Sequence, residues 1–259
     1  MQNRIDQLFN TKSRNILSVY FTAGYPGLND TAEIIEELQN SGADLAEIGI
    51  PFSDPTADGP TIQYSNQVSL KNGMNLKLLF KQLEKIRDKV EIPLIMMGYI
   101  NPVLQFGVEN FCRQCSETGI DGVILPDLTP EEFEKNYRKF FDQYNLYNIL
   151  LITPQTPEER IKYVDNATGG FIYMVSSAST TGEGKKIDDF NLSYFERINK
   201  MELKHPRLIG FGISDNATFI NACKYAGGAI IGSAFVKSLQ PDRLLRRLVK
   251  EFIDNIISS

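Results

Sequence analysis

The sequence predicts a single (β/α)8 barrel, in which eight parallel strands alternate with eight helices. Short runs of β-branched and other apolar residues recur along the 259-residue chain, each followed by a longer amphipathic segment, which is the pattern of repeated βαβ units. Eight such pairs average roughly 32 residues each, as a barrel requires, whereas a doubly wound sheet usually has fewer strands. No linker separates a second domain, so residues 1–259 are expected to form one domain.

The strands are expected where the apolar runs are shortest and richest in β-branched residues. Several of these runs are too continuously apolar for a half-exposed sheet, so both faces should be buried. An additional helix at about 2–9 is expected to cover the bottom of the barrel. The predicted strands are 16–22, 43–50, 92–99, 122–125, 148–152, 171–176, 207–211 and 229–231.

Three helix starts have the spacing of a capping box, in which a polar side chain caps the helix and an acidic residue follows three positions later. In two of them, those at Thr129 and Thr156, proline stands at the expected first helical position. The pairs are Asp30 with Glu33, Thr129 with Glu132, and Thr156 with Glu159.

The composition indicates an ordinary globular protein and excludes several classes of partner. Hydrophobic residues make up 42% and charged residues 23% of the chain, so a sizeable core is expected. The net charge of −5, without a long basic run, argues against binding to nucleic acid or an anionic membrane. Residues 1–11 lack the apolar core of a signal peptide, and no apolar stretch is long enough to span a membrane. A cytoplasmic location is therefore expected.

Cysteine and histidine are too scarce to suggest a metal site. The odd count of three cysteines predicts reduced thiols, and the C-x-x-C formed by Cys112 and Cys115 falls in a helical pattern without further ligands. His205 is the only histidine, and a surface role is expected for it. No metal is predicted, and acid–base chemistry must rely on carboxylates, tyrosines or lysines.

Glycine-rich turns follow the last two predicted strands. The active site of such a barrel lies at the carboxyl ends of its strands, and the seventh and eighth loops often bind phosphate. Backbone N–H groups at Gly212, Gly232 and Ser233 are therefore expected to hold a phosphate, the last two at the start of a short helix. Each glycine alone would indicate only a tight turn, but their joint placement favours an anion site.

Glu47 is expected to point into the barrel from the second strand. Strand alternation puts Glu47 and Gly49 on one face, and Ile48 and Ile50 on the face that packs under helices. Gly49 would leave space above the carboxylate for a ligand, and partial burial would raise its pKa toward that of a general acid or base. The alternative is a buried carboxylate bonded to a tyrosine, for which Tyr20, Tyr99 and Tyr173 are available.

Other polar features leave two interpretations open. Asp58 lies in a loop rich in aspartate and proline, where a turn is the more common role and a functional one is the alternative. The polar segment 177–186 is expected to be a lid over the barrel mouth, with an ordinary surface loop as the alternative.

No lysine lies in or directly after a predicted strand, which argues against a Schiff-base aldolase. The reaction classes that remain are acid–base cleavage and isomerisation of a sugar-phosphate-like substrate.

Several motifs resemble those of the tryptophan synthase α-subunit family along nearly the whole chain. The longest is E-I-G-I-P-F-S-D-P-x-A-D-G-P-x-I-Q, from Glu47 to Gln63. The others are F-T-A-G-Y-P-G from Phe21, Y-I-N-P from Tyr99, P-D-L from Pro126, T-G at Thr181, G-F-G-I-S from Gly210 and I-G-S-A from Ile231.

The resemblance implies retro-aldol cleavage of indole-3-glycerol phosphate to indole and glyceraldehyde 3-phosphate, without a cofactor in this subunit. It assigns the proton transfers to Glu47 and the indole N–H contact to Asp58. Thr181 would close the lid, and Asp54 and Asn101 would face a pyridoxal-phosphate-dependent β subunit in an α2β2 heterotetramer that receives indole through a tunnel. It also implies that the substrate pocket is lined by Tyr20, Ile62, Met97, Tyr99, Ile124, Tyr173 and Phe211, and that phosphate is held by Gly182, Gly212, Gly232 and Ser233.

One segment departs from the family pattern. The lid of the family usually carries an arginine or another residue, then glycine and valine, before its Thr-Gly pair, whereas Ser177, Ser179 and Thr180 occupy those places here. Two other functions remain open at the level of sequence. One is a free-standing indole-glycerol-phosphate lyase, and the other is a non-catalytic barrel that activates its partner, against which the retained Glu47 and Asp58 argue.

Overall fold

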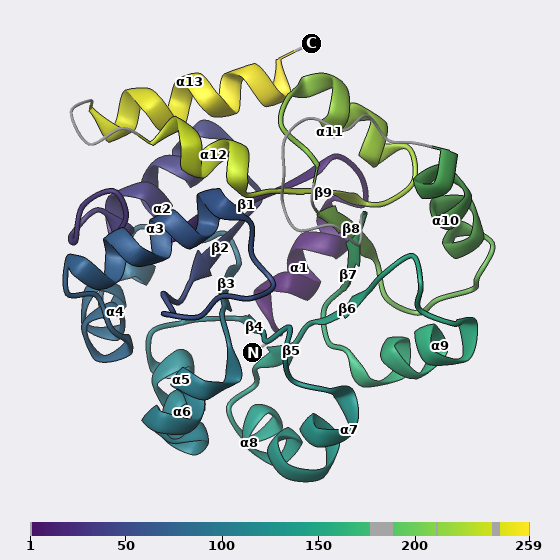
Figure 1. Cartoon of the computed structure of the whole chain (residues 1–259), viewed down its shortest axis with the longest axis horizontal. Helices are drawn as coiled ribbons and strands as arrows, with labels where there is room; N and C mark the ends of the chain where they lie inside the picture. The colour runs from purple at the N-terminus through teal and green to yellow at the C-terminus, as the bar shows by residue number, and fades with distance from the viewer. Residues whose placement is uncertain (1, 177–188, 211, 240–243, 259) are drawn as a thin grey trace.

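The computed structural model describes residues 2–176, 189–210, 212–239 and 244–258. Nine parallel strands form one sheet in the order β5-β4-β3-β2-β1-β9-β8-β7-β6, which curls into a nearly closed barrel surrounded by helices (Figure 1). The strands are β1 (Ile16–Thr22), β2 (Leu45–Gly49), β3 (Leu94–Met97), β4 (Gly122–Ile124), β5 (Tyr147–Asn148), β6 (Leu150–Ile152), β7 (Ile172–Val175), β8 (Arg207–Gly210) and β9 (Gly228–Ile231).

The predicted barrel is confirmed, but its fifth strand is divided in two. β5 pairs with β4 and β6 pairs with β7, while Ile149 lies between them and donates its N–H to the Val123 carbonyl (2.9 Å). The next N–H, of Leu150, donates to the Thr168 hydroxyl (3.0 Å). A side chain thus takes the place of a backbone acceptor, and this interrupts the ladder where the ring closes.

The helices lie outside the strands and connect them. They are α1 (Arg4–Thr11), α2 (Thr31–Ser41), α3 (Pro60–Lys71), α4 (Leu76–Leu83), η1 (Ile86–Asp88), α5 (Ile100–Phe106), α6 (Val108–Glu117), α7 (Pro130–Glu132), η2 (Phe133–Tyr137), α8 (Arg138–Gln143), α9 (Glu158–Ala167), α10 (Asp189–Asn199), α11 (Asn216–Cys223), α12 (Ser233–Ser238) and α13 (Leu245–Ile257). In the part of the chain that the structure describes, no helix has the length and apolar character needed to cross a membrane.

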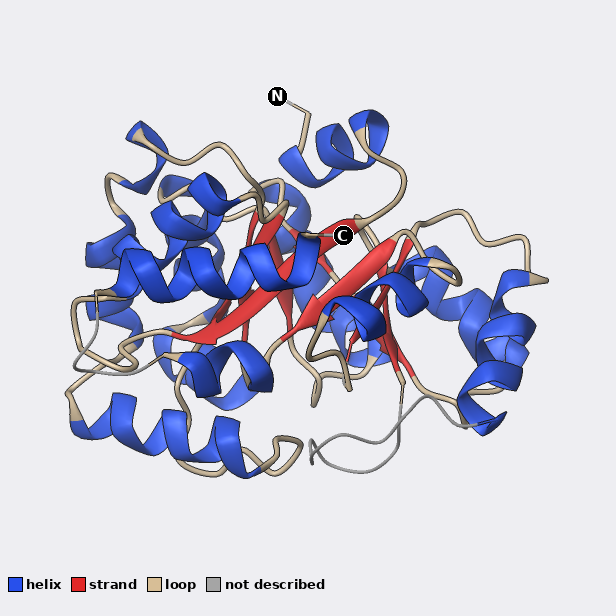
Figure 2. Ribbon diagram, turned by 90° about the horizontal axis from the view of Figure 1, so that it is seen from above, coloured by secondary structure: helices blue, strands red, loops and turns tan. Residues whose placement is uncertain are grey.

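The predicted N-terminal helix is present at one end of the strands (Figure 2), although it runs from residue 4 to 11. Asn3 caps it by accepting from the Ile5 N–H (3.0 Å), and its Nδ2 donates to the Asp121 carbonyl (2.9 Å). The Asp121 carboxylate also binds Arg4 (3.0 Å) and Arg87 (2.6 Å). This network fixes α1 to the bottom of the barrel.

Two of the three predicted helix caps are wrong. Thr129 accepts from the Glu132 N–H (3.2 Å), as expected. Asp30 instead accepts from the Gly27 N–H (2.8 Å), and Thr156 accepts from the Thr153 N–H (2.9 Å), ahead of a helix that begins at Glu158. In both cases the short polar side chain closes a local turn in place of capping the helix.

The core has two layers, separated by the sheet. Inside the barrel, alternate strand residues form a cluster closed below by Ile5 of α1. Outside, the other strand residues pack against the helices, and the buried thiols of Cys112 and Cys115 belong to this layer. Those two cysteines are therefore core residues. The inner cluster contains Ile16, Leu45, Ile95, Ile124, Ile149, Phe171, Tyr173, Leu208 and Ile230.

The single histidine has a modest role. The His205 side chain is 28% exposed, and its Nδ1 lies 3.1 Å from Oδ1 of Asp165. It thus lies at the surface of the connection before β8, as expected, and helps to fix that connection to α9.

Candidate active site

Glu47 points into the barrel from β2, as strand alternation predicts. Its neighbours Ala46 and Ile48 belong to the outer layer, whereas Glu47 is fully buried inside the ring. Oε1 accepts a hydrogen bond from the Ser18 hydroxyl (2.7 Å), a residue of β1 that the sequence did not single out. Oε2 has no hydrogen-bond partner among the described residues. The carboxylate is therefore held at one oxygen only.

Burial gives the Glu47 carboxylate the properties of an acid–base group. Loss of solvation raises its pKa from 4.5 to about 7, and the Ser18 bond opposes that rise. A pKa near the working pH makes the protonated and ionised forms both available, which a group that gives and takes protons in one cycle requires.

Asp58, in the loop between β2 and α3, binds a tyrosine that follows β3. Its Oδ2 accepts from the Tyr99 hydroxyl (3.0 Å), which itself accepts from the Ala57 N–H (3.0 Å). Burial raises the pKa of Asp58 to about 6, against the opposing effect of the Tyr99 bond. The Tyr99 ring also stacks on Phe52, with centroids 5.1 Å apart. Asp58 and two residues before it thus contact Tyr99, which lies just after the third strand.

The space above Glu47 is not open in the way the sequence suggested. A Cβ at Gly49 would meet the Tyr20 hydroxyl at 2.2 Å, so the ring of Tyr20 fills the room that the glycine leaves. The arrangement recurs across the barrel, where a Cβ at Gly210 would meet the Tyr173 hydroxyl at 2.1 Å. Glycine at both strand ends makes room for a tyrosine, and the tyrosines define what remains for a ligand.

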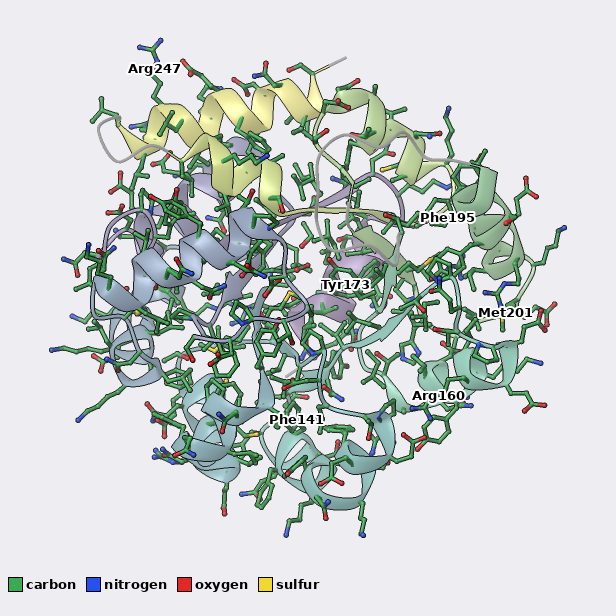
Figure 3. All side chains as sticks on the ribbon, viewed as in Figure 1. Phe141, Arg160, Tyr173, Phe195, Met201 and Arg247 are labelled. Atoms are coloured by element: carbon green, nitrogen blue, oxygen red, sulfur yellow. The ribbon has the colours of Figure 1, made fainter. Side chains whose placement is uncertain are left out.

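Two buried tyrosines feel the charges of the carboxylates. The pKa of Tyr173 is raised mainly by burial, and next by the charges of Glu47 and Asp58. The pKa of Tyr20 is also raised mainly by burial, and next by the charge of Asp58. Tyr173 lies near the centre of the barrel, far from peripheral side chains such as Arg160 and Arg247 (Figure 3). The region is thus enclosed and bears two acidic groups.

The other predicted pocket residues come from different elements. Ile62 of α3 and Ile124 of β4 are buried, whereas Met97 of β3 is half-buried and packs on the inner cluster. The two predicted partner-facing residues, Asp54 and Asn101, are exposed. Phe211, Thr181 and Gly182 lie outside the described residues, as do the positions at which the lid departs from the family pattern, Ser177, Ser179 and Thr180.

The predicted phosphate-binding residues follow β8 and β9. Gly212 has a φ of +75°, and a Cβ there would lie 3.8 Å from the Ser176 hydroxyl at the end of β7. Gly232 precedes α12, whose first residue is Ser233, and no side chain among the described residues caps that helix. A Cβ at Gly232 would lie 3.4 Å from the Tyr20 ring. The start of α12 therefore lies beside the region that Glu47 and Asp58 face.

Comparison with known proteins agrees with this geometry. The family described as "Tryptophan synthase alpha chain" matches residues 7–255. The tryptophan synthase alpha chain of Flavobacterium psychrophilum is 56% identical over 237 residues, which cover 92% of this chain and 93% of the relative. The chain belongs to the tryptophan synthase alpha chain family.

Other members of the tryptophan synthase alpha chain family support the assignment over the full length. The relative from Bacteroides fragilis is 53% identical over 250 residues, which cover 95% of each chain. The crystal structure of the tryptophan synthase alpha chain from Legionella pneumophila has a TM-score of 0.88 at 30% identity, and covers 99% of this chain and 96% of that one.

Membership establishes the reaction. The alpha chain of tryptophan synthase is the subunit that cleaves indole-3-glycerol phosphate, so this chain is a lyase of tryptophan biosynthesis, as its motifs imply. Alpha chains need no cofactor of their own, and their partner is a β subunit.

Proposed function

We propose that Glu47 and Asp58 carry out the cleavage, with Glu47 as the proton-transfer group and Asp58 as the group that binds the indole N–H. The observation that carries this proposal is their shared setting. Both carboxylates have raised pKa values, about 7 and about 6, and both charges act on the tyrosine of β7. This shared setting supports a role for both on one substrate.

The reaction needs two proton transfers, which Glu47 can perform in turn. Protonated Glu47 donates to C3 of the indole ring, which makes the ring a leaving group and places positive charge on its nitrogen. Ionised Glu47 then takes the proton of the glycerol hydroxyl next to the bond that breaks, so that an aldehyde forms and the bonding electrons return to the ring. The carboxyl group ends protonated, as it began.

Asp58 supplies the complementary charge. With a pKa of about 6 it is mostly ionised at neutral pH, so it can accept the indole N–H and stabilise positive charge as that charge develops on the ring. Tyr99 donates to Oδ2 and so orients the carboxylate for that contact.

Further roles are proposed for the residues around the two acids. Gly212, Gly232 and Ser233, together with Gly182, would hold the phosphate through backbone N–H groups and the start of α12, which no described side chain caps. Thr181 would close the lid. The walls of the pocket would be Tyr20, Ile62, Met97, Tyr99, Ile124, Tyr173 and Phe211.

The partner is proposed to be a pyridoxal-phosphate-dependent β subunit in an α2β2 heterotetramer, with Asp54 and Asn101 at the contact because both are exposed. Indole would pass to that subunit through a tunnel. A cytoplasmic location agrees with the three unpaired cysteines, Cys112, Cys115 and Cys223.

A lyase assay on the chain alone and with the β subunit added tests the proposed partner. Full activity alone, unchanged by the β subunit, would favour a free-standing lyase, and inactivity in both conditions a non-catalytic activator.

The test of the catalytic assignment is a pair of aspartate substitutions in the same assay. Asp58→Asn should lower kcat/KM by about 10²-fold or more, because a neutral amide cannot stabilise the charge that develops on the ring. Asp44→Asn is the matched control, since Asp44 binds Lys12 (2.6 Å) just before β2 at the opposite end of the barrel. It should lower stability and leave kcat/KM nearly unchanged. Equal effects of the two variants would contradict the role of Asp58.

A further inference from the structure

A buried serine beneath the catalytic layer is the most informative polar residue outside the groups described above. Ser18 lies on β1 with 0% exposure, and in the parallel register it pairs with Leu45, whereas Tyr20 pairs with Glu47. The Glu47 side chain therefore reaches back by one layer to accept the Ser18 hydroxyl (2.7 Å). Other residues of that interior, such as Ile95 and Ile230, are apolar.

The two oxygens of the Glu47 carboxylate are not equivalent. Oε1 is occupied by the Ser18 hydroxyl, and Oε2 is buried without a hydrogen-bond partner in the described part of the chain. A buried acceptor left unpaired is costly in a folded protein, and such exceptions concentrate where a ligand or catalysis completes the site. An oxygen that already accepts a hydrogen bond is also the poorer of the two as a proton carrier.

We propose that Ser18 is a positioning residue for the lyase reaction, whose hydroxyl holds Oε1 of Glu47 and leaves Oε2 as the oxygen that exchanges protons with the substrate. This inference rests on the proposed role of Glu47. An apolar residue at position 18 would fit the surrounding layer equally well, but it would leave both carboxylate oxygens buried without a partner.

The hydrogen bond has a predictable effect on titration. Burial raises the pKa of Glu47 to about 7, and the Ser18 bond is the interaction that opposes this rise, because it stabilises the ionised form. Removing the hydroxyl should raise the pKa further. The protonated form, with which the proposed cycle begins, would then persist to higher pH.

Other titratable groups near Glu47 can be separated from it. Tyr20, Tyr99 and Tyr173 all have pKa values raised above that of free tyrosine, so they stay neutral below pH 9. Asp58 is the other described group at the site that titrates near neutrality, at about 6. An upward shift of the higher step, from about 7, can therefore be assigned to Glu47.

The experiment compares Ser18→Ala and Ser18→Thr with wild type in the full-length chain with its β subunit. We expect Ser18→Ala to move the Glu47-dependent limb of the pH profile of kcat/KM upward by about one to two pH units, the effect of losing a hydrogen bond to a charged group. Ser18→Thr retains the hydroxyl and should restore the wild-type limb. The Glu47 carboxyl ¹³C signal, assigned by its loss in Glu47→Gln, should titrate with the same shift.

Ser69→Ala is the matched control, because Ser69 is equally buried but donates to the Ala23 carbonyl (2.5 Å). It should lower stability without moving the limb. An unmoved limb and an unmoved carbon titration in Ser18→Ala would overturn the inference. An active Glu47→Gln would instead overturn the proposed role of Glu47, and the carbon titration would still report whether Ser18 controls its protonation.

Discussion

The Tyr20 hydroxyl lies over Gly49, so close that a Cβ on the glycine would come within 2.2 Å of it and within 2.7 Å of the ring carbon Cζ. The contact joins β1 to β2 near the Glu47 carboxylate. Because Tyr20 also lies beside Gly232, its ring connects the proposed acid–base and phosphate-binding parts of the site.

This contact predicts an unusual cost for a small substitution. Gly49→Ala should destabilise the fold by about 1–3 kcal/mol and lower kcat, because the ring of Tyr20 must leave its position. Combining it with Tyr20→Leu should recover part of that stability, so that the two effects are not additive. Urea unfolding of the two single variants and the double variant measures the coupling. Strict additivity would show that the ring adjusts without strain.

Glu47→Gln should abolish cleavage and leave binding of a phosphorylated substrate analogue nearly intact. The amide keeps the shape of the carboxylate but cannot transfer protons, and loss of general acid–base catalysis predicts a drop of about 10²–10⁴-fold in kcat. Steady-state assays and calorimetric titration of the analogue test the two parts separately. Retention of more than about a tenth of wild-type turnover would lie well outside that range and rule out Glu47 as the proton-transfer group.

The raised pKa of Glu47 also predicts how stability depends on pH. Between pH 4.5, the value for an unfolded glutamate, and about 7, the folded protein binds more protons at this site than the unfolded chain does. The contribution of Glu47 is therefore fully present below pH 4.5 and is lost as the pH rises through 7. The free energy of unfolding of wild type relative to Glu47→Gln should fall across this window by up to about 3 kcal/mol. A difference that is constant or rises with pH would contradict the raised pKa.

The proposed phosphate site predicts a ligand effect on thermal stability. Inorganic phosphate or glyceraldehyde 3-phosphate should raise the Tm of wild type, and Gly232→Asp should remove that effect by placing a carboxylate in the anion site. Gly73→Asp is the matched control, since a Cβ at Gly73 meets no atom within 4 Å and its left-handed backbone is one that aspartate tolerates. The control should keep the wild-type ligand shift. Equal shifts in wild type and Gly232→Asp would place the phosphate elsewhere.

The placement of Glu47 could be predicted because strand alternation is a local property. Its burial and its pKa near 7 follow once the strand is known to lie inside a barrel. The role of Asp58 could not be predicted from local pattern, because its setting depends on Tyr99, which is 41 positions later in the chain. Here the family motif supplied what the local sequence lacked.

Other features were hidden for the same reason. A serine within a strand carries no signal until its acceptor is known, so Ser18 was missed although its register against β2 determines the contact. Gly49 was expected to leave space for a ligand, which is wrong, because the Tyr20 ring of β1 fills that space. The interruption of the fifth strand depends on Thr168, 18 residues after the amide that it binds.

That interruption gives the ring a seam, and its position has a mechanical consequence. β5 and β6 end the strand order, and β2 and β1 occupy its fourth and fifth places of nine, so the two strands that carry Glu47 and Ser18 lie opposite the seam. Transient local opening of the barrel should be most frequent at the interrupted fifth strand, because opening occurs most readily where hydrogen bonding is weakest. The carboxylate and its serine thus lie on strands far from the seam in the strand order, and we expect slower amide exchange there than at the seam.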